Sequence, residues 1–351
     1  MATKLRAQAS VSTQSTTPAT AKAAAGSTFE ETFVRNDAVS LCLLINRRAR
    51  MMRVIDFRAG ASPAKKLFVQ SIARREGVDK VVALVERDEC STWARLGFVR
   101  EGNVPGFYKR SDAFIMGYVV PPPNAPATAA AGPSVASTGG RSRLAESGVF
   151  SVGRHTLYPV EEQELEDDAP APAPSAVAER TVTQARRHGK ELASHPFPAV
   201  KLTAASPTEV ARRIAQATKE DRALTGFESF GRDVTRDDVI VSAKGMPDLL
   251  IGAEIQRCYG NAFLEVLTAP RDDRERAMLC GALRAACERL LVADIVCAFA
   301  LTPADAVKMG AAFVANGFRR TGLLRQHLRL KGARVDAILW SRKLAGAPEG
   351  E

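Results

Sequence analysis

The sequence contains no apolar run near the ~20 residues that a membrane-spanning helix requires, so we expect a soluble protein without membrane contact. Its 351 residues are 46% hydrophobic and 25% charged, which excludes a fibrous or wholly disordered protein. That length is enough for about two domains of ordinary size.

The six cysteines form no CxxC motif or other close pair, and most of them lie among apolar residues. This spacing argues against a disulfide framework and a zinc site, and the scattered histidines agree. It favours buried, reduced thiols, and we therefore place the protein in the cytoplasm.

Acidic residues are outnumbered, 39 against 49 basic ones, and the net charge of +10 favours anionic partners without selecting one. Basic residues concentrate between Arg319 and Lys343, where the only acid is Asp336. Two interpretations stay open: a solvated outer strand face, or a site for an anionic substrate, carrier protein or nucleic acid. Residues 324–331, where basic and apolar residues partly alternate, include no Phe, Tyr or Trp for base stacking, which disfavours nucleic acid.

Shifts in composition divide the chain. The first segment is rich in Ala, Ser and Thr and lacks acids, which predicts a disordered tail, although an organelle transit peptide has a similar composition. A middle segment combines Pro-Ala tracts with the acidic run Glu161–Asp168, a solvated spacer or a segment that docks on a basic surface. The predicted organisation is a tail (1–27), an N-terminal module (28–120), a disordered linker (121–177), a C-terminal module (178–344) and a second tail (345–351).

Hydrophobic periodicity predicts a mixed α/β sheet with flanking helices and a parallel middle pair of strands. Thr302 is predicted to cap a helix whose first turn holds Pro303. The N-terminal module is expected to contain strands Met52–Phe57 and Lys80–Val85, helices Pro63–Arg75 and Asp88–Leu96, and two final strands ending at Val120. The C-terminal module is expected to contain helices Glu179–Leu192, Pro207–Lys219 and Asp273–Leu290, and strands Val239–Ala243, Leu249–Glu254, Phe263–Thr268, Asp294–Leu301, Phe318–Leu328 and Val335–Arg342.

An internal repeat relates the two modules. The segment Gly97–Gly102 (GFVREG) matches Gly317–Gly322 (GFRRTG) at four of six positions. Each copy follows a predicted helix and precedes an Asp-Ala pair with an apolar triplet, at Asp112 and Asp336. Matching residues in matching structural positions predict two related folding units, of which the N-terminal one is shortened.

The sequence resembles the GNAT superfamily of acyl-CoA-dependent N-acyltransferases, whose order of strands and helices fits residues 237–344. It is most similar to the two-part β-lysine N-acetyltransferase type, on the Gly97–Gly102 segment, on Pro105–Tyr108 (PGFY) with Asp112, and on His195–Pro198 (HPFP). The resemblance implies acetyl or acyl transfer from acetyl-CoA to a primary amine, with a small amino acid as acceptor.

In the family, the CoA pyrophosphate binds a loop of the form R/Q-x-x-G-x-G/A at the start of the central helix, where free amides hold an anion. The corresponding segment here, Pro270–Ala277, has no glycine and is rich in acids. Two interpretations stay open: a helix start capped by its own carboxylates, or an altered loop that binds phosphate through arginine side chains. The cofactor-binding residues implied by the resemblance are Val266, Thr268, Arg271, Arg274 and Arg276.

The resemblance also implies a catalytic base on the strand before this loop, a position that Glu265 occupies. Desolvation would raise the pKa of such a carboxylate into a useful range, unless it faces solvent. The family's general acid, a tyrosine, is replaced by Phe313, so water would protonate the leaving thiolate. The alternative to an enzyme is an inactive GNAT-fold binding or scaffold module that uses the basic segment 319–343.

Overall fold

The computed structural model describes residues 30–35, 39–56, 60–122, 175–224 and 234–345. Those up to Val120 and from Ser175 onwards belong to one compact unit. The predicted tails, except Ala345, and the predicted linker between residues 123 and 174 lie outside the described residues. No helix in the described part of the chain is both long and apolar enough to cross a membrane.

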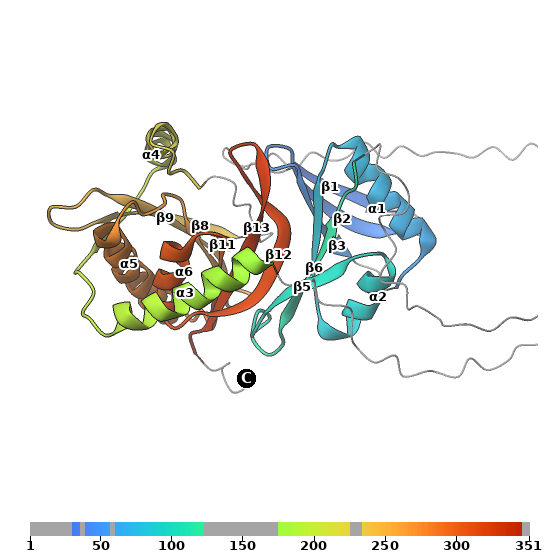
Figure 1. Cartoon of the computed structure of the whole chain (residues 1–351). Coiled ribbons are helices and arrows are strands. Elements are labelled where there is room, and N and C mark those ends of the chain that lie inside the picture. Colours follow the sequence, from blue (N-terminus) through green and yellow to red (C-terminus); the bar gives the residue numbers. More distant parts are fainter. Residues whose placement is uncertain (1–29, 36–38, 57–59, 123–174, 225–233, 346–351) are drawn as a thin grey trace, which may run out of the picture. The chain divides into compact units, whose positions relative to one another are not determined.

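Both halves contain the predicted central strands and helices, with small shifts at their ends (Figure 1). The sequence did not predict β1, β2 or β7. The first half contains β1 (Glu30–Arg35), β2 (Ser40–Asn46), β3 (Met51–Asp56), α1 (Pro63–Arg75), β4 (Lys80–Val85), the 3-10 turn η1 (Arg87–Glu89), α2 (Cys90–Arg95), β5 (Val99–Val104) and β6 (Ala113–Val119). The second half contains α3 (Ala176–Ala193), β7 (Lys201–Ala204), α4 (Pro207–Lys219), β8 (Thr235–Ser242), β9 (Leu249–Gln256), β10 (Asn261–Val266), α5 (Asp273–Val292), β11 (Cys297–Pro303), α6 (Val307–Ala315), β12 (Arg319–Leu330) and β13 (Ala333–Lys343).

All described strands form one 13-stranded sheet in the order β1-β2-β3-β4-β6-β5-β12-β13-β11-β10-β9-β8-β7. The predicted mixed α/β architecture is confirmed: β3 pairs with β4, and β10 with β11, in parallel, whereas the neighbouring pairs are antiparallel. Each parallel pair is the centre of its half, and an α-helix connects its two strands, as a parallel connection requires.

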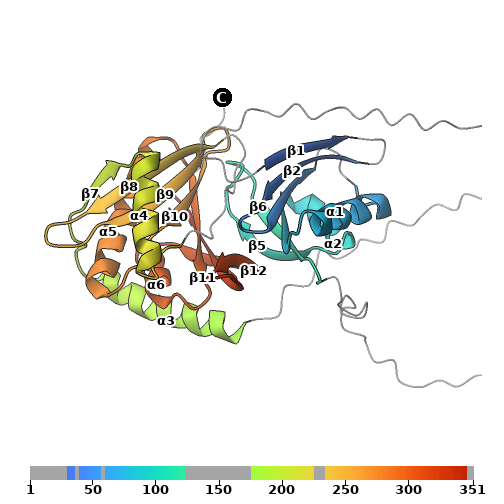
Figure 2. The ribbon, with the colours of Figure 1, turned by 90° about the horizontal axis from the view of Figure 1, so that it is seen from above.

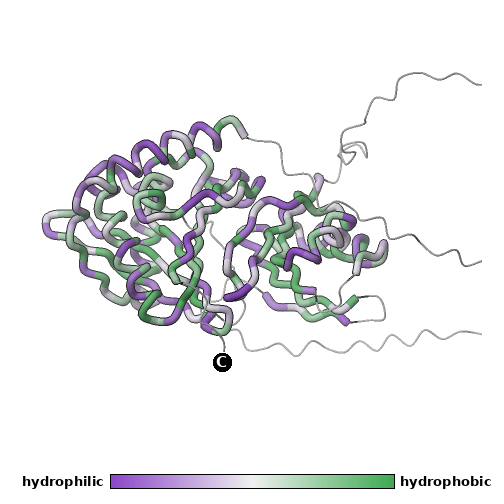
Figure 3. The backbone as a smooth tube through the Cα atoms, turned by 90° about the horizontal axis from the view of Figure 1, so that it is seen from below, coloured by the Kyte–Doolittle hydropathy of each residue, from purple (hydrophilic) through white to green (hydrophobic). Residues whose placement is uncertain are grey.

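Helices cover one face of the sheet in each half (Figures 1 and 2). Met52 and Val54 of β3 pack with Val69 and Ile72 of α1, so by strand alternation Arg53 points to the opposite face. In the second half, Leu264 of β10 lines a crevice against α5, which places its neighbours on the face away from that helix. Hydrophobic residues accordingly follow the sheet, and hydrophilic ones recur along the outer helices (Figure 3).

The two halves join where the repeat predicts equivalent residues. Gly102 of β5 pairs directly with Gly322 of β12, and both strands carry an irregularity just before that glycine. The backbones approach so closely that a Cβ atom on Gly322 would lie 2.6 Å from the Cα atom of Gly102. The two copies of the internal repeat therefore meet at equivalent glycines and form the joint between the halves. The sequence alone did not predict this contact.

The basic segment 319–343 contributes to this joint. Arg329 donates to the carbonyl oxygen of Arg48 at 2.9 Å, and Arg334 donates to those of Ala49 and Arg50. Lys331 pairs with Asp221 at 2.6 Å in the second half itself. Several of its charges thus bind groups of this chain.

The predicted N-cap at Thr302 is wrong. Thr302 is fully buried in β11, and its hydroxyl accepts a hydrogen bond from the indole nitrogen of Trp340 at 2.9 Å. The following helix begins at Val307 after a turn. The apolar strand continues through Thr302 because its hydroxyl has a buried partner, a tertiary contact that local capping rules cannot anticipate.

We expect Gly322→Ala to destabilise the protein by ~3 kcal/mol or more, because the added methyl group meets backbone atoms of β5 rather than a movable side chain. Gly332→Ala is the control: an alanine there strains a backbone with a φ of 80° but meets open space, so its cost is limited to about 1 kcal/mol. Chemical denaturation measures both. Equal effects would show that close packing at the joint is unimportant.

Candidate functional site

Four charged side chains from three adjacent strands form a cluster on the face of the sheet away from α5. Arg236 of β8 donates to Asp238 at 3.0 Å and to Glu254 of β9 at 3.1 Å. The same guanidinium forms an ion pair with Glu265 of β10. One arginine therefore faces three carboxylates, and the cluster has an excess of negative charge.

Gly252 makes this arrangement possible. It lies between Asp238 and Glu265 in the strand register, and a Cβ atom there would come within 2.7 Å of the Arg236 guanidinium. The arginine thus reaches across β9 through the space that the missing side chain leaves. Sequence reasoning identified Glu265 but missed Arg236, Glu254 and this glycine, because a cross-strand row depends on register.

Glu265 is 3% exposed, so it is a buried rather than a solvent-facing residue of its strand. Burial raises its pKa to about 8; Arg236 opposes this shift, and the neighbouring Glu254 adds to it. A carboxyl group with a pKa near neutrality can exchange protons at physiological pH, as a general base must.

The parallel pair separates next to Glu265. The ladder between β10 and β11 runs from Asn261 to Leu264 opposite Cys297 to Ala300, although both strands continue beyond it. Just after the end of β10, the amides of Leu267 and Thr268 both donate to the carbonyl oxygen of Leu250. Two successive amides thus share one acceptor, which forms a bulge. Separated parallel strands leave backbone groups that an extended amide-containing ligand can pair with.

Val266 and Thr268 lie at this separation, where they were predicted to contact a cofactor. Val266 is buried, and the hydroxyl of Thr268 accepts a hydrogen bond from the amide of Leu250 at 2.8 Å. Both residues therefore hold the strand end in place through contacts within the chain.

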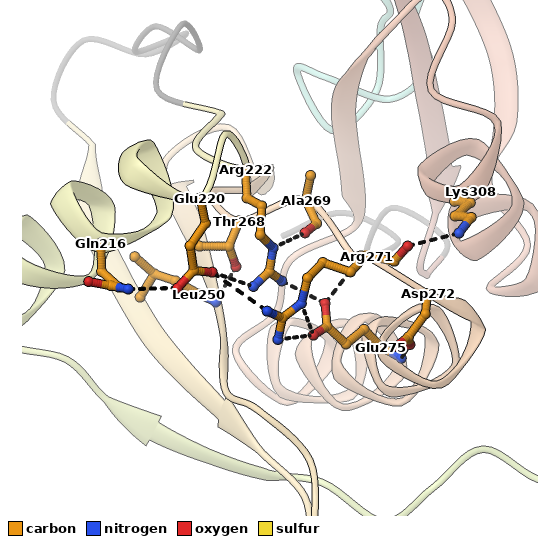
Figure 4. A network of polar contacts seen from close by, with 10 residues as sticks. All are labelled: Gln216, Glu220, Arg222, Leu250, Thr268, Ala269, Arg271, Asp272, Glu275 and Lys308. Atoms are coloured by element: carbon orange, nitrogen blue, oxygen red, sulfur yellow. Dashed lines mark hydrogen bonds and ion pairs between the residues drawn. The ribbon is translucent and has the colours of Figure 1, made fainter.

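The start of α5 is capped by its own carboxylates (Figure 4). Asp272 accepts from the amide of Glu275 at 2.9 Å, and the buried Glu275 carboxylate accepts from the amide of Arg271 at 2.9 Å. Arg222 and Arg271 clamp Glu275 at 2.6 and 2.8 Å. Glu275 thus places a carboxylate at the helix N-terminus, where an anion would bind.

The three predicted phosphate-binding arginines differ in whether their side chains already form ion pairs. Arg271 is engaged with Glu275, and Arg276 pairs with Asp273 at 3.4 Å. Arg274 is exposed and forms no ion pair with any residue that the structure describes. Of the three, Arg274 offers the most available charge.

A cavity of about 170 Å³ lies beside this helix start, between α4 and the ends of β9 and β10. It is rich in guanidinium groups, which Glu209, Glu220, Asp248 and Glu275 partly neutralise. Thr268 and Leu250 form its inner wall, so the cavity adjoins the bulge. The arginines that line it are Arg212, Arg213, Arg222 and Arg271.

The predicted general-acid position is occupied by a buried apolar ring, since Phe313 is fully buried against Phe318. Two phenols lie elsewhere: Tyr108, from the turn between β5 and β6, meets Tyr259 edge to face at 5.3 Å. Burial raises the pKa of Tyr108 to about 12. This contact joins a turn of the first half to the second half.

Solved structures that resemble part of this chain include N-acetyltransferases. The spermidine N-acetyltransferase from Vibrio cholerae, in complex with CoA and spermine, has 12% identity and a TM-score of 0.34, and the match covers 43% of this chain and 98% of that one. The ribosomal-protein-S18-alanine N-acetyltransferase from Escherichia coli has 16% identity and a TM-score of 0.32, with 44% and 99% covered. No family model and no curated protein sequence matches the chain.

Proposed function

We propose that the protein transfers an acyl group from acyl-CoA, with acetyl-CoA as the expected donor, to a primary amine. The observation that carries this proposal is the separation of β10 from β11 directly beside Glu265, a buried carboxyl group whose pKa is raised to about 8. The separation offers backbone groups to an extended thioester ligand, and the carboxyl offers a base at the same place.

Acetyl-CoA supplies the acyl group when it is bound. Glu265 accepts a proton from the ammonium form of the acceptor, which frees the nitrogen lone pair for attack on the thioester carbonyl. The excess negative charge around Arg236 favours binding of a cationic amine. The C–N bond forms and the C–S bond breaks. The nitrogen then releases its second proton, which reaches the departing thiolate through water, since Phe313 cannot supply one.

The start of α5 fits a pyrophosphate only in part. The amides of Glu275 and Arg271 are already bound by the carboxylates of Asp272 and Glu275, so these two donors are not free for the amide-cradled arrangement of the family. The arginine side chains do fit an anion, and Arg274 with Arg276 would supply the charge that backbone amides supply elsewhere.

Calorimetry with acetyl-CoA tests the proposal. We expect binding, with Arg274→Ala weakening it roughly tenfold because a charge-assisted contact is lost. Arg276→Ala should act in the same direction. The double variant Asp272→Asn with Asp273→Asn should bind more tightly, because repulsion is reduced. No binding at millimolar acetyl-CoA would contradict acyl transfer, and unchanged affinity in all three variants would place the pyrophosphate elsewhere.

One observation favours a second candidate function, a non-catalytic binding or scaffold module. Glu275 already holds the helix start with a carboxylate of the chain itself, as expected if this end has only a structural role. The scaffold reading requires that a stable, folded protein bind no acyl-CoA, so the same calorimetry separates the two candidates.

A further inference from the structure

Arg53 is a half-buried arginine, two of whose guanidinium nitrogens lie buried and unpaired among the residues that the structure describes. It lies on β3, on the face of the first half away from α1, and its Nε and Nη1 atoms are buried without a hydrogen-bond partner in the described part of the chain. A buried polar group without a partner carries a free-energy cost that a structural role does not explain. The unmet donors of Arg53 therefore call for a group that is not among the described residues.

The surroundings of Arg53 belong to both halves. Burial lowers its pKa, and the ionisable groups that oppose this shift include Tyr108 of the first half and Glu254 and Tyr259 of the second. Glu254 is a member of the Arg236 cluster, which also contains Glu265. Arg53 thus faces the same region as the proposed catalytic base.

The charges on the two sides of this region are opposite. The second half presents three carboxylates against one arginine, which suits an ammonium group. The first half presents Arg53, whose guanidinium fork suits a carboxylate or a phosphate. A ligand that satisfies both sides carries one group of each sign.

We infer that Arg53 binds an anionic group, a carboxylate or a phosphate, on the acceptor whose amine is presented to Glu265. The first half of the chain then serves as the part of the acceptor site that selects bifunctional amines. This inference rests on the proposed function, since it assigns the acceptor of that reaction.

The test compares three probes of matched chain length on the full-length protein: an alkylamine, an ω-amino acid and an aminoalkyl phosphate. Ligand-induced shifts in melting temperature are measured without acetyl-CoA, and acetyl transfer is measured with it. We expect the wild type to prefer one of the two anionic probes over the alkylamine by ~10-fold or more, and Arg53→Met to lose that preference. The preferred probe distinguishes carboxylate from phosphate.

Arg53→Met should also raise the melting temperature of the ligand-free protein, because it removes a buried charge and keeps the shape of the side chain. Arg35→Met is the control, since Arg35 is exposed on β1 of the same half. It should change neither the preference nor the melting temperature.

The inference would be overturned if the wild type showed no preference for an anionic probe over the alkylamine, or if Arg53→Met kept that preference. A loss of acetyl-CoA affinity in Arg53→Met would also overturn it, because the anion would then be part of CoA. Failure of the proposed function is distinguishable, because it appears as absent acetyl-CoA binding and leaves the melting-temperature comparison intact.

Discussion

Glu265→Gln is expected to lower acetyl transfer by ~10²–10⁴-fold, because it removes the base but keeps a side chain of the same shape beside Arg236. In the wild type, the rate should rise with pH and level off above about 8, where Glu265 has lost its proton. The variant should show a flat profile over this range. Asp237→Asn is the matched control, since Asp237 lies on β8 next to the cluster but pairs with Arg289 at 3.0 Å instead.

The same pKa predicts how stability depends on pH. The native carboxyl keeps its proton up to a pH of about 8, whereas an unfolded glutamate loses its proton at about 4.3. Between these values the native state binds more protons, so the free energy of unfolding should fall as pH rises. Glu265→Gln has no carboxyl group to titrate at this position, so its free energy of unfolding should not fall in this way. It should therefore be more stable than the wild type at pH 8. A fully active variant with an unchanged stability profile would remove Glu265 from the mechanism.

Glu275→Gln is expected to destabilise the protein by ~3–5 kcal/mol, because it neutralises a buried carboxylate that both Arg222 and Arg271 bind. Arg222 is mostly buried and would keep only Glu220, at 3.2 Å, as an acidic partner among the residues that the structure describes. Urea unfolding measures the loss. Glu288→Gln, at an exposed position of the same helix, should cost less than about 0.5 kcal/mol.

Acetyl-CoA affinity of Glu275→Gln separates the two interpretations of the helix start. If a pyrophosphate displaces the Glu275 carboxylate from the helix end, removal of its charge should increase affinity, even though the protein is less stable. A large loss of stability with unchanged affinity would instead identify this end of α5 as purely structural.

The sequence predicted the parts of the fold that depend on local patterns. Pro63–Arg75 and Pro207–Lys219 have the predicted boundaries because each helix starts with a serine cap followed by proline, a signal contained within four residues. The edge strand β7 was missed because it has only four residues, too few for a periodic pattern. The joint between the halves was missed because it depends on close contact of two glycines far apart in the chain.

The candidate site divides in the same way. Glu265 was identifiable because a family resemblance marks one position on one strand. Its partners Arg236 and Glu254 become visible only when the register of three strands is known, and Arg53 only when two halves of the chain are placed in one unit. Sequence patterns report neighbours along the chain, whereas the charge balance of a site depends on neighbours in space.

The pairing of β5 with β12 has a consequence for solubility. Exposed strand edges are templates for aggregation, and two separate sheets would present four of them. The single described sheet presents two, β1 and β7. β1 carries Glu30, Glu31 and Arg35, and β7 is very short, both of which discourage pairing with another chain. The joint thus covers one edge of β5 and one edge of β12. Separation of the halves would expose both strand edges to pairing with other chains.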